Sequence, residues 1–211
     1  MTTLLSLRKK LSKIKQIIGI DLKQDELLLT AFIHRSFINE NRSDAKEHNE
    51  RLEFLGDSVL GMIVASMLYK AFPEEPEGVL SQFRSRLVDV DACAFYMEKI
   101  GLNQFILLGK GEEKTQGHQK SSILANVFEA VIAAIFLEGG YSLAEEFLTK
   151  QFFEEMHKML QTPSSNYKAV LQDYSQKKSQ KTPNYKVAKE EGPDHAKRFY
   201  VKVFVEEEEI G

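Results

Sequence analysis

The stretch Glu50-Arg-Leu-Glu-Phe-Leu-Gly-Asp57 decides how this chain can fold. It places carboxylates at positions i, i+3 and i+7, which fall within about 60° of one another around a helix. Residues 58–65, which follow, are almost entirely apolar, and a helix that is hydrophobic on every side is normally buried. A buried carboxylate is unfavourable unless it is paired, protonated or bound to a cation. The sequence therefore predicts acids beside a hydrophobic core, with positive charge close to them.

A second helix with the same character is predicted over residues 123–137. This segment is apolar on every side except at Asn126 and Glu129. If the two helices cross at these polar positions, Glu53, Asp57, Asn126 and Glu129 converge. Oxygen ligands of this kind suit Mg²⁺ or Mn²⁺ rather than zinc. Such a site indicates phosphodiester hydrolysis by a metal-activated water.

The spacing leaves a structural alternative open. The same acids could form ion pairs with arginines, for which Arg51, Arg84 and Arg86 are candidates. Structural ion pairs are the more frequent use of such acids. From the residues alone, the metal site is therefore one of two hypotheses.

Composition narrows the class of protein. The chain has 211 residues, of which 43% are hydrophobic, which is enough for a packed core. The single cysteine, Cys93, excludes an internal disulfide and offers no zinc cluster, and it fits a reducing compartment. No apolar run approaches the roughly 18 residues of a membrane span, and the N-terminus lacks the apolar stretch of a signal peptide. These features predict a cytoplasmic protein that does not enter a membrane.

Charge separates the two ends of the chain. Residues 1–160 hold 19 basic and 23 acidic side chains, a net charge of −4. Residues 161–205 hold 9 basic and 4 acidic side chains, a net charge of +5. A slightly acidic body with a basic appendage indicates a catalytic part followed by a part that binds a polyanion.

Apolar periodicity and breaker residues predict the elements of both parts. Helices are expected over residues 5–20, 26–35, 49–70, 78–100 (as one helix or two), 123–137 and 141–160. Polar loops are expected at 39–47 and 108–117. After a linker at 161–165, a helix is expected at 167–178 and strands at 184–188 and 199–205, joined by a turn at 192–195. The body, 1–160, is therefore all-α, and the tail, 166–211, is α+β.

The start of the helix expected over residues 49–70, called the signature helix below, resembles the sequence signature of the ribonuclease III family. The resemblance rests on His48-Asn-Glu-Arg-Leu-Glu-Phe-Leu-Gly-Asp-Ser58, supported by Phe32-Ile-His-Arg-Ser36, Glu77-Gly78, Leu108-Gly-Lys-Gly-Glu112 and Ser122-Ile-Leu-Ala-Asn-Val-Phe-Glu129. From Asn166 onward the chain resembles a double-stranded-RNA-binding domain. The resemblance implies an all-α endonuclease domain followed by an α-β-β-β-α domain, truncated in this chain.

The activity that the resemblance implies is hydrolysis of double-stranded RNA, with roles in processing rRNA and mRNA precursors. The family requires Mg²⁺, for which Mn²⁺ substitutes, and uses no organic cofactor. It leaves 5′-phosphate and 3′-hydroxyl ends with short 3′ overhangs. The bacterial form is a homodimer, whose interface would use the signature helix through residues such as Phe54 and Leu55.

Site residues follow from the same resemblance. Glu53, Asp57 and Glu129 fall on metal-ligand and catalytic carboxylates, and Asp57 and Glu129 fall on the two most critical acids. Glu50 and Glu77 fall on accessory acids. For Glu50 a structural role is the alternative, namely an ion pair that supports the subunit interface.

One position departs from the family pattern. Asn126 stands where the family usually has aspartate. An asparagine still offers its carbonyl oxygen to a metal, but without a charge. We therefore expect weaker metal binding or a higher Mg²⁺ requirement rather than loss of activity.

The tail carries the residues expected to bind RNA. Gln172 and Gln176 lie at i and i+4 on one predicted helix face, and Pro193 and His195 belong to the loop that the family inserts into the next minor groove. A solvated helix face and an exposed loop histidine are the alternatives. The chain ends at Gly211, before the family's third strand and last helix, so residues 206–209 are expected in a turn and RNA affinity is expected to be weak.

Two other functions are compatible with parts of the sequence. A protein on the same fold could bind duplex RNA without cutting it, and only Asn126 favours this. An all-helical scaffold without an RNA role would leave the glutamines of the tail unexplained. A non-cleaving relative should have lost the acids, yet Glu53, Asp57 and Glu129 are all present.

Overall fold

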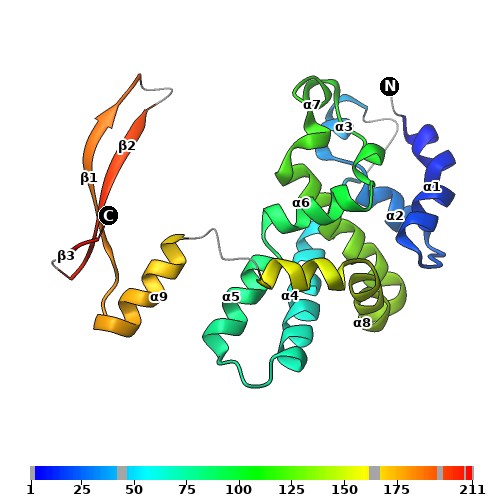
Figure 1. Ribbon diagram of the computed structural model, residues 1–211. Helices are drawn as coiled ribbons and strands as arrows, with labels where there is room; N and C mark the ends of the chain where they lie inside the picture. Colours follow the sequence, from blue (N-terminus) through cyan, green and yellow to red (C-terminus); the bar gives the residue numbers. More distant parts are fainter. Residues whose placement is uncertain (1–2, 42–46, 162–166, 194–196, 207, 211) are drawn as a thin grey trace. The chain divides into compact units, whose positions relative to one another are not determined.

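The computed structural model describes residues 3–41, 47–161, 167–193, 197–206 and 208–210. They belong to two compact units, Met1–Gln161 and Thr162–Gly211 (Figure 1). Residues 162–165 of the predicted linker lie outside the described residues.

The described elements of the first unit are helices, as the sequence predicts, apart from one isolated bridge. Its α-helices are α1 (Leu4–Ile18), α2 (Asp25–Ala31), α3 (Arg35–Glu40), α4 (Glu50–Ala71), α5 (Glu77–Leu87), α6 (Val90–Lys99), α7 (Lys110–Lys114) and α8 (Ser121–Gln161). Two short 3₁₀ turns, η1 (Asn103–Phe105) and η2 (Gly117–Gln119), flank α7. Helix α8 packs against both α4 and α6 and forms the centre of the core.

Aromatic side chains fill the core where α6 meets α8. The rings of Tyr96 and Phe152 have centroids 4.8 Å apart, and Phe128 packs edge-on against Phe152 at 5.5 Å. All three side chains are fully buried. The Tyr96 hydroxyl donates a hydrogen bond to the Leu87 carbonyl oxygen at 3.2 Å, so the only polar atom in this cluster is satisfied.

Helices α4 and α8 approach one another at backbone distance. Gly56 of α4 is buried against α8, and a Cβ atom built on it would lie 1.8 Å from the carbonyl oxygen of Glu129. Any residue with a side chain would therefore push the two helices apart. The absence of a Cβ at position 56 is what allows α4 and α8 to cross here.

Helix α8 is interrupted at the predicted glycine pair. Gly140 has a φ of 71° and a ψ of −166°, which are not helical values, and only glycine adopts them without strain. The chain resumes a helical course at once, so the break is a kink rather than a loop. The expected division between residues 137 and 141 is thus present as a change of direction within α8.

One predicted helix is wrong. The expected helix over residues 26–35 ends at Ala31, and a separate helix, α3, begins at Arg35. Between them Ile33 forms a bridge with Leu107: the His34 backbone NH donates to the Leu107 carbonyl oxygen and the Leu107 NH donates to that of Phe32. This long-range pairing straightens residues that have helical periodicity, so tertiary structure overrides the local pattern.

The glycine-rich segment also contains more structure than the sequence indicated. Helix α7 and turn η2 form where a loop was expected over residues 108–117, and α3 extends to Glu40 within the loop expected at 39–47. Glu40 lies at the start of α7, where its Oε2 accepts a hydrogen bond from the Lys110 NH at 3.0 Å. An acid at a helix N-terminus satisfies free backbone donors there.

The second unit consists of a helix and an antiparallel sheet. It contains α9 (Tyr167–Ser179), β1 (Asn184–Glu191), β2 (Arg198–Val205) and β3 (Glu208–Glu209), with strand order β1-β2-β3. The expectation that residues 206–209 form only a turn is corrected by β3. Glu209 pairs with Phe204 in the sheet, and its carboxylate lies 2.8 Å from the Lys202 ammonium.

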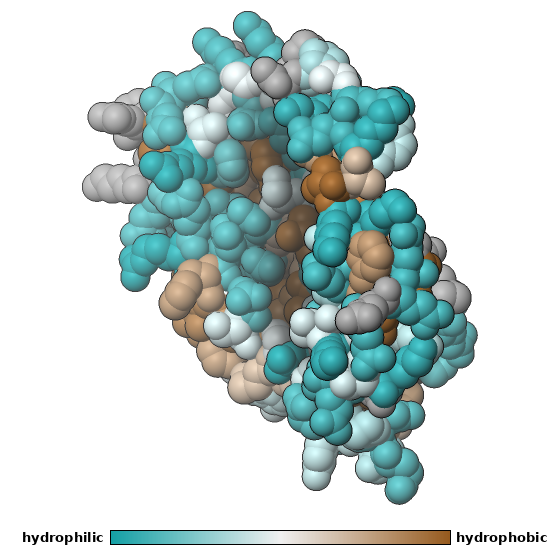
Figure 2. All heavy atoms as spheres, turned by 90° about the vertical axis from the view of Figure 1, so that its left-hand side faces the viewer, coloured by the Kyte–Doolittle hydropathy of each residue, from teal (hydrophilic) through white to brown (hydrophobic). Residues whose placement is uncertain are grey.

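Within the described part of the chain, two helices, α4 and α8, are long and apolar enough to cross a membrane by length and composition alone. This differs from the sequence expectation that no segment approaches that length. Core helices of folded domains meet the same criterion; 61% of the most apolar window of α8 and 39% of that of α4 are buried inside the protein. The face of the molecule drawn in Figure 2 is mainly hydrophilic.

We predict that Gly56→Ala destabilises the protein by at least about 2 kcal/mol, because the added methyl group forces two packed backbones apart. Gly61→Ala on the same helix is the matched control, since a Cβ there meets nothing within 4 Å. That control should leave stability unchanged or raise it by up to about 1 kcal/mol. Urea unfolding followed by circular dichroism measures both, and equal effects of the two substitutions would contradict the prediction.

Candidate active site

Three carboxylates gather around the crossing of α4 and α8. Glu53 and Asp57 lie on α4, three residues before and one residue after Gly56, and Glu129 is the residue of α8 that Gly56 touches. Glu53 and Glu129 are half-buried, whereas Asp57 is exposed. The close approach of the two backbones therefore brings acids from positions 72 residues apart to one place.

The pKa values of two of these acids show that their negative charges lie close together and that no nearby positive charge among the described residues balances them. Burial, followed by the charges of Asp57 and Glu53, raises the pKa of Glu129 to about 7. Burial, followed by the charges of Glu50 and Asp57, raises the pKa of Glu53. Each of these causes opposes ionisation, so negative charge accumulates here without a balancing cation among the residues that the structure describes.

One carboxylate oxygen of this acidic cluster also lacks a hydrogen bond within the described part of the chain. Glu53 Oε2 is buried and has no hydrogen-bond partner. A buried carboxylate oxygen without a donor is costly, and it is suited to accept a cation. The donor set consists of oxygen atoms, which hard divalent ions such as Mg²⁺ prefer. The residues present therefore fit a divalent metal ion.

The side chains are not arranged as a finished metal site. Among the described residues, no three His, Cys, Asp or Glu side chains are placed to hold one ion together. Asn126 is half-buried on α8, one turn before Glu129, which puts its amide on the same side of the helix as that carboxylate. Binding of an ion would thus require rotation of side chains on two helices that already face one another.

Glu50 takes part in ion pairs at the start of α4. Its Oε1 lies 3.5 Å from Arg35 Nη1, and its Oε2 lies 3.8 Å from His48 Nδ1. Arg35 is a partner that the sequence did not single out, in contrast to Arg51, Arg84 and Arg86. The pairing supports a structural role for Glu50, although its charge also acts on Glu53.

The hydrogen bond of Glu77 is to a residue of its own helix and not to the acids at the crossing of α4 and α8. It is exposed at the first position of α5, where its Oε1 accepts a hydrogen bond from Ser81 Oγ at 2.7 Å. The charges that raise the pKa of Glu129 are those of Asp57 and Glu53. An accessory role for Glu77 stays a prediction.

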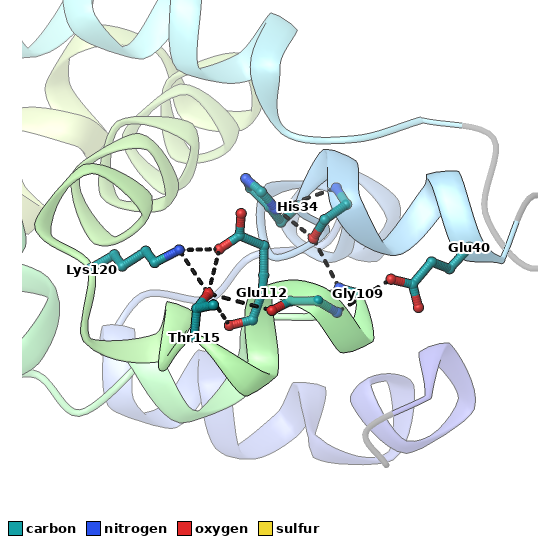
Figure 3. Close-up of polar contacts among 8 residues, drawn as sticks. His34, Glu40, Gly109, Glu112, Thr115 and Lys120 are labelled. Atoms are coloured by element: carbon teal, nitrogen blue, oxygen red, sulfur yellow. Dashed lines mark hydrogen bonds and ion pairs between the residues drawn. The ribbon is translucent and has the colours of Figure 1, made fainter. Parts of the chain in front are cut away.

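A polar network that the sequence did not predict holds the segment before α8 (Figure 3). Lys120 Nζ donates to Glu112 Oε2 at 2.6 Å and to Thr115 Oγ1 at 2.9 Å. The Gly109 NH donates to Ser36 Oγ at 2.9 Å. Because Lys120 immediately precedes α8, these contacts fix the start of the helix that carries Asn126 and Glu129. The motifs around Ser36 and Glu112 were visible in the sequence, but their mutual contact was not.

His34 joins this network to the acidic end of α4. Its Nδ1 lies 2.8 Å from Ser36 Oγ and accepts a hydrogen bond from the Ser36 NH. Burial lowers the pKa of His34, and the charges of Glu112 and Glu50 partly oppose that effect. The histidine is therefore placed between α7 and the start of α4 as a mainly neutral group.

In the second unit, the two glutamines expected to bind RNA are exposed on α9. Gln172 and Gln176 are one turn apart and therefore share a face of that helix. Pro193 is exposed two residues after the end of β1. His195 lies outside the described residues.

Comparison with known proteins gives the same two-part division. Residues 24–156 match a family model described as ribonuclease-III-like, and residues 167–211 match one for the double-stranded RNA binding motif. Ribonuclease 3 of Protochlamydia amoebophila is 50% identical over 194 residues, which cover 92% of this chain and 80% of that protein. Ribonuclease 3 of Borreliella burgdorferi is 43% identical over 201 residues, covering 95% and 82%.

Solved structures are similar to the helical unit. The nuclease domain of ribonuclease III from Campylobacter jejuni, in a crystal structure at 2.2 Å, has a TM-score of 0.63 and 34% identity, and the match covers 74% of this chain and 99% of that one. A second structure of that domain, with a TM-score of 0.61 and 36% identity over 67% of this chain and 98% of that one, concerns flexibility in a region involved in dimer formation.

We predict that Glu129→Gln stabilises the metal-free protein above pH 8 by about 1–3 kcal/mol. Because the folded-state pKa is raised from 4.5 to about 7, ionising Glu129 destabilises the fold. That cost is absent below about pH 4.5, grows as the pH rises to about 7, and is complete above it. Urea unfolding in EDTA at pH 5 and pH 8 measures it. A stabilisation of equal size at both values would mean that the Glu129 charge is not the cause.

Proposed function

Since the chain belongs to the ribonuclease III family and is an endoribonuclease whose substrate is double-stranded RNA, we propose that it cuts this RNA at the crossing of α4 and α8 with Mg²⁺ as cofactor. Mn²⁺ is expected to substitute. The proposed ligands are Glu53, Asp57, Asn126 and Glu129, and the last two carboxylates, Asp57 and Glu129, are the proposed catalytic residues.

The observation that carries this proposal is the uncompensated negative charge at the crossing. Burial and mutual repulsion raise the pKa of both Glu53 and Glu129, and one oxygen of Glu53 is buried without a donor. A divalent cation relieves all of these costs at once, because it attracts the ionised form of every acid around it. Glu53 and Asp57 lie on either side of Gly56, the residue at which α4 and α8 pack closely. The packing of the two helices therefore keeps these acids near Glu129, where their charges repel one another.

The chemistry follows from where the acids lie. A bound Mg²⁺ supplies a Lewis acid for the scissile phosphate and lowers the pKa of a water nucleophile. Glu129 is half-buried at this crossing, and as an ionised ligand it would hold the ion beside the scissile phosphate. We propose products with 5′-phosphate and 3′-hydroxyl ends and short 3′ overhangs, and precursor rRNA and mRNA as substrates.

We also propose that the active form is a homodimer joined through the start of α4. Phe54 is 81% exposed and lines a surface cavity of about 630 Å³ together with Leu27, Leu55 and Leu137. An exposed aromatic ring beside an apolar hollow fits a two-fold interface, in which each subunit offers the same patch to the other. A monomeric mass in sedimentation experiments at micromolar concentration would exclude this.

RNA binding by the second unit is proposed for Gln172, Gln176, Pro193 and His195. The exposed glutamines share one face of α9, and side-chain amides can bond the 2′-hydroxyls and base edges of a minor groove. The double substitution Gln172→Ala/Gln176→Ala should therefore weaken binding to duplex RNA. Unchanged affinity in filter binding would remove α9 from the interface.

We predict that Glu129→Ala lowers the cleavage rate of a long RNA duplex in Mg²⁺ by at least about 100-fold, while duplex binding in Ca²⁺ stays unchanged. Glu154→Ala, an exposed acid on α8 beyond the kink, is the matched control and should cut normally. Sequencing the product ends tests for the 5′-phosphate and 3′-hydroxyl. Normal cleavage by Glu129→Ala would contradict the assignment, and a wild type that binds duplex RNA without cutting it would contradict the proposed activity.

A further prediction concerns Asn126, which contributes no charge to the proposed ligands. Asn126→Asp should lower the Mg²⁺ concentration for half-maximal cleavage by several-fold, on the order of 1 kcal/mol of binding free energy, because a fourth carboxylate attracts the ion more strongly. The measurement is a Mg²⁺ titration of the initial cleavage rate. An unchanged titration would mean that Asn126 does not contact the metal.

A further inference from the structure

Among the described residues, three buried polar atoms lack a hydrogen-bond partner, all near the start of α4, and two of them belong to Asn49 and Glu53. These two are the amide nitrogen Nδ2 of Asn49 and the carboxylate oxygen Oε2 of Glu53. One is a hydrogen-bond donor and the other is an acceptor. Leaving either unsatisfied in the interior costs about 1–3 kcal/mol, so each atom has a strong tendency to find a partner.

The backbone places these two side chains next to each other. The Glu53 NH donates to the Asn49 carbonyl oxygen at 2.8 Å, which forms the first turn of α4. Residues at i and i+4 lie on the same face of a helix with their Cβ atoms about 5–6 Å apart. An asparagine amide and a glutamate carboxylate at this spacing are within reach of a direct hydrogen bond.

Among the described residues, nothing accepts a hydrogen bond from the side-chain amide nitrogen of Asn49. It precedes the first residue of α4, where an asparagine usually caps the helix from an extended backbone. Here its φ of −70° and ψ of −17° are helical, and its side chain makes no capping hydrogen bond. The residue is only 1% exposed, and its own NH donates to the Ile33 carbonyl oxygen at 2.9 Å. Asn49 is thus held rigidly, with its amide enclosed by protein.

The neighbouring histidine does not compete for the same partner. His48 Nδ1 also lacks a hydrogen bond, but it lies 3.8 Å from Glu50 Oε2 and its side chain is 29% exposed. Of the three unpartnered atoms, Asn49 Nδ2 is therefore the donor that shares a face with Glu53.

We propose that Asn49 is a positioning residue for Glu53. Both side chains lack this partner in the structure; when the Glu53 carboxylate turns to hold the cation, one of its oxygens accepts a hydrogen bond from the Asn49 amide and the other is left for the cation. This inference rests on the metal site proposed above. A hydrogen bond from a fixed donor sets the orientation of a ligating carboxylate and removes the two unsatisfied atoms together. Residues that support metal ligands in this way typically change metal affinity by 10–100-fold.

The first test observes the amide directly and needs no substitution. In the full-length chain without RNA, the side-chain NH₂ resonances of Asn49 should shift when Mg²⁺ is added. Those of Asn41 should not, because its Nδ2 already donates to the Phe37 carbonyl oxygen at 2.9 Å. Binding of Mg²⁺ seen by calorimetry, without any shift at Asn49, would overturn this proposal while leaving the metal site standing. No Mg²⁺ binding at all would overturn the metal site and this inference with it.

The second test separates positioning from a general loss of structure. Asn49→Leu keeps the shape of the side chain but removes the donor, and it should raise the Kd for Mg²⁺ about tenfold, with Asn41→Ala unchanged. In a Glu53→Gln background, Asn49→Leu should add no comparable loss, because the carboxylate it positions is gone. A tenfold loss in both backgrounds would show a structural effect and overturn the proposal. If Asn49→Leu unfolds, the resonance titration of the wild type decides the question.

Discussion

The contact between Gly56 and the backbone of Glu129 is the constraint on which the rest of the structure depends. It allows α4 and α8 to touch where a side chain would separate them. The two helices carry much of the apolar core on either side of that point. Because acids flank the contact on both helices, the packing that stabilises the domain is also the packing that brings the carboxylates together.

At the crossing of α4 and α8, the charges that the proposed metal site needs lower the stability of the fold. Burial and like charges make ionisation of Glu53 and Glu129 unfavourable, and nothing in the packing of the helices requires acids there. The surrounding core, including the aromatic cluster of α6 and α8, offsets the cost. A protein that holds unfavourable charges in a rigid frame is prepared for a ligand that neutralises them, which is the physical basis for the proposal of a divalent metal at this crossing.

Supporting contacts come from parts of the chain far from the acids in sequence. The bridge between Ile33 and Leu107 joins the segment before α3 to the segment before α7, and Lys120 and Glu112 fix the approach to α8. Asn49 takes its backbone partner, Ile33, from the same region. The start of α4 and the start of α8 are thus held by one connected set of loops, so the orientation of the acids does not depend on two isolated helices.

The sequence by itself determined the family, the helical body, the α+β tail, and the placement of the acids on two strongly apolar helices, because these depend on local periodicity and on contiguous motifs. It did not determine how far each helix is buried: only 39% of the most apolar window of α4 is. It also did not determine that the helix expected over residues 26–35 ends at Ala31 and that a new one begins at Arg35, since that break comes from a backbone pairing with Leu107. Nor could it show that position 129 meets position 56, that Glu50 pairs with Arg35, or that the amide of Asn49 and the carboxylate of Glu53 are both left without partners. These depend on distances between segments remote in sequence, and only the packing of α4 on α8 decides them.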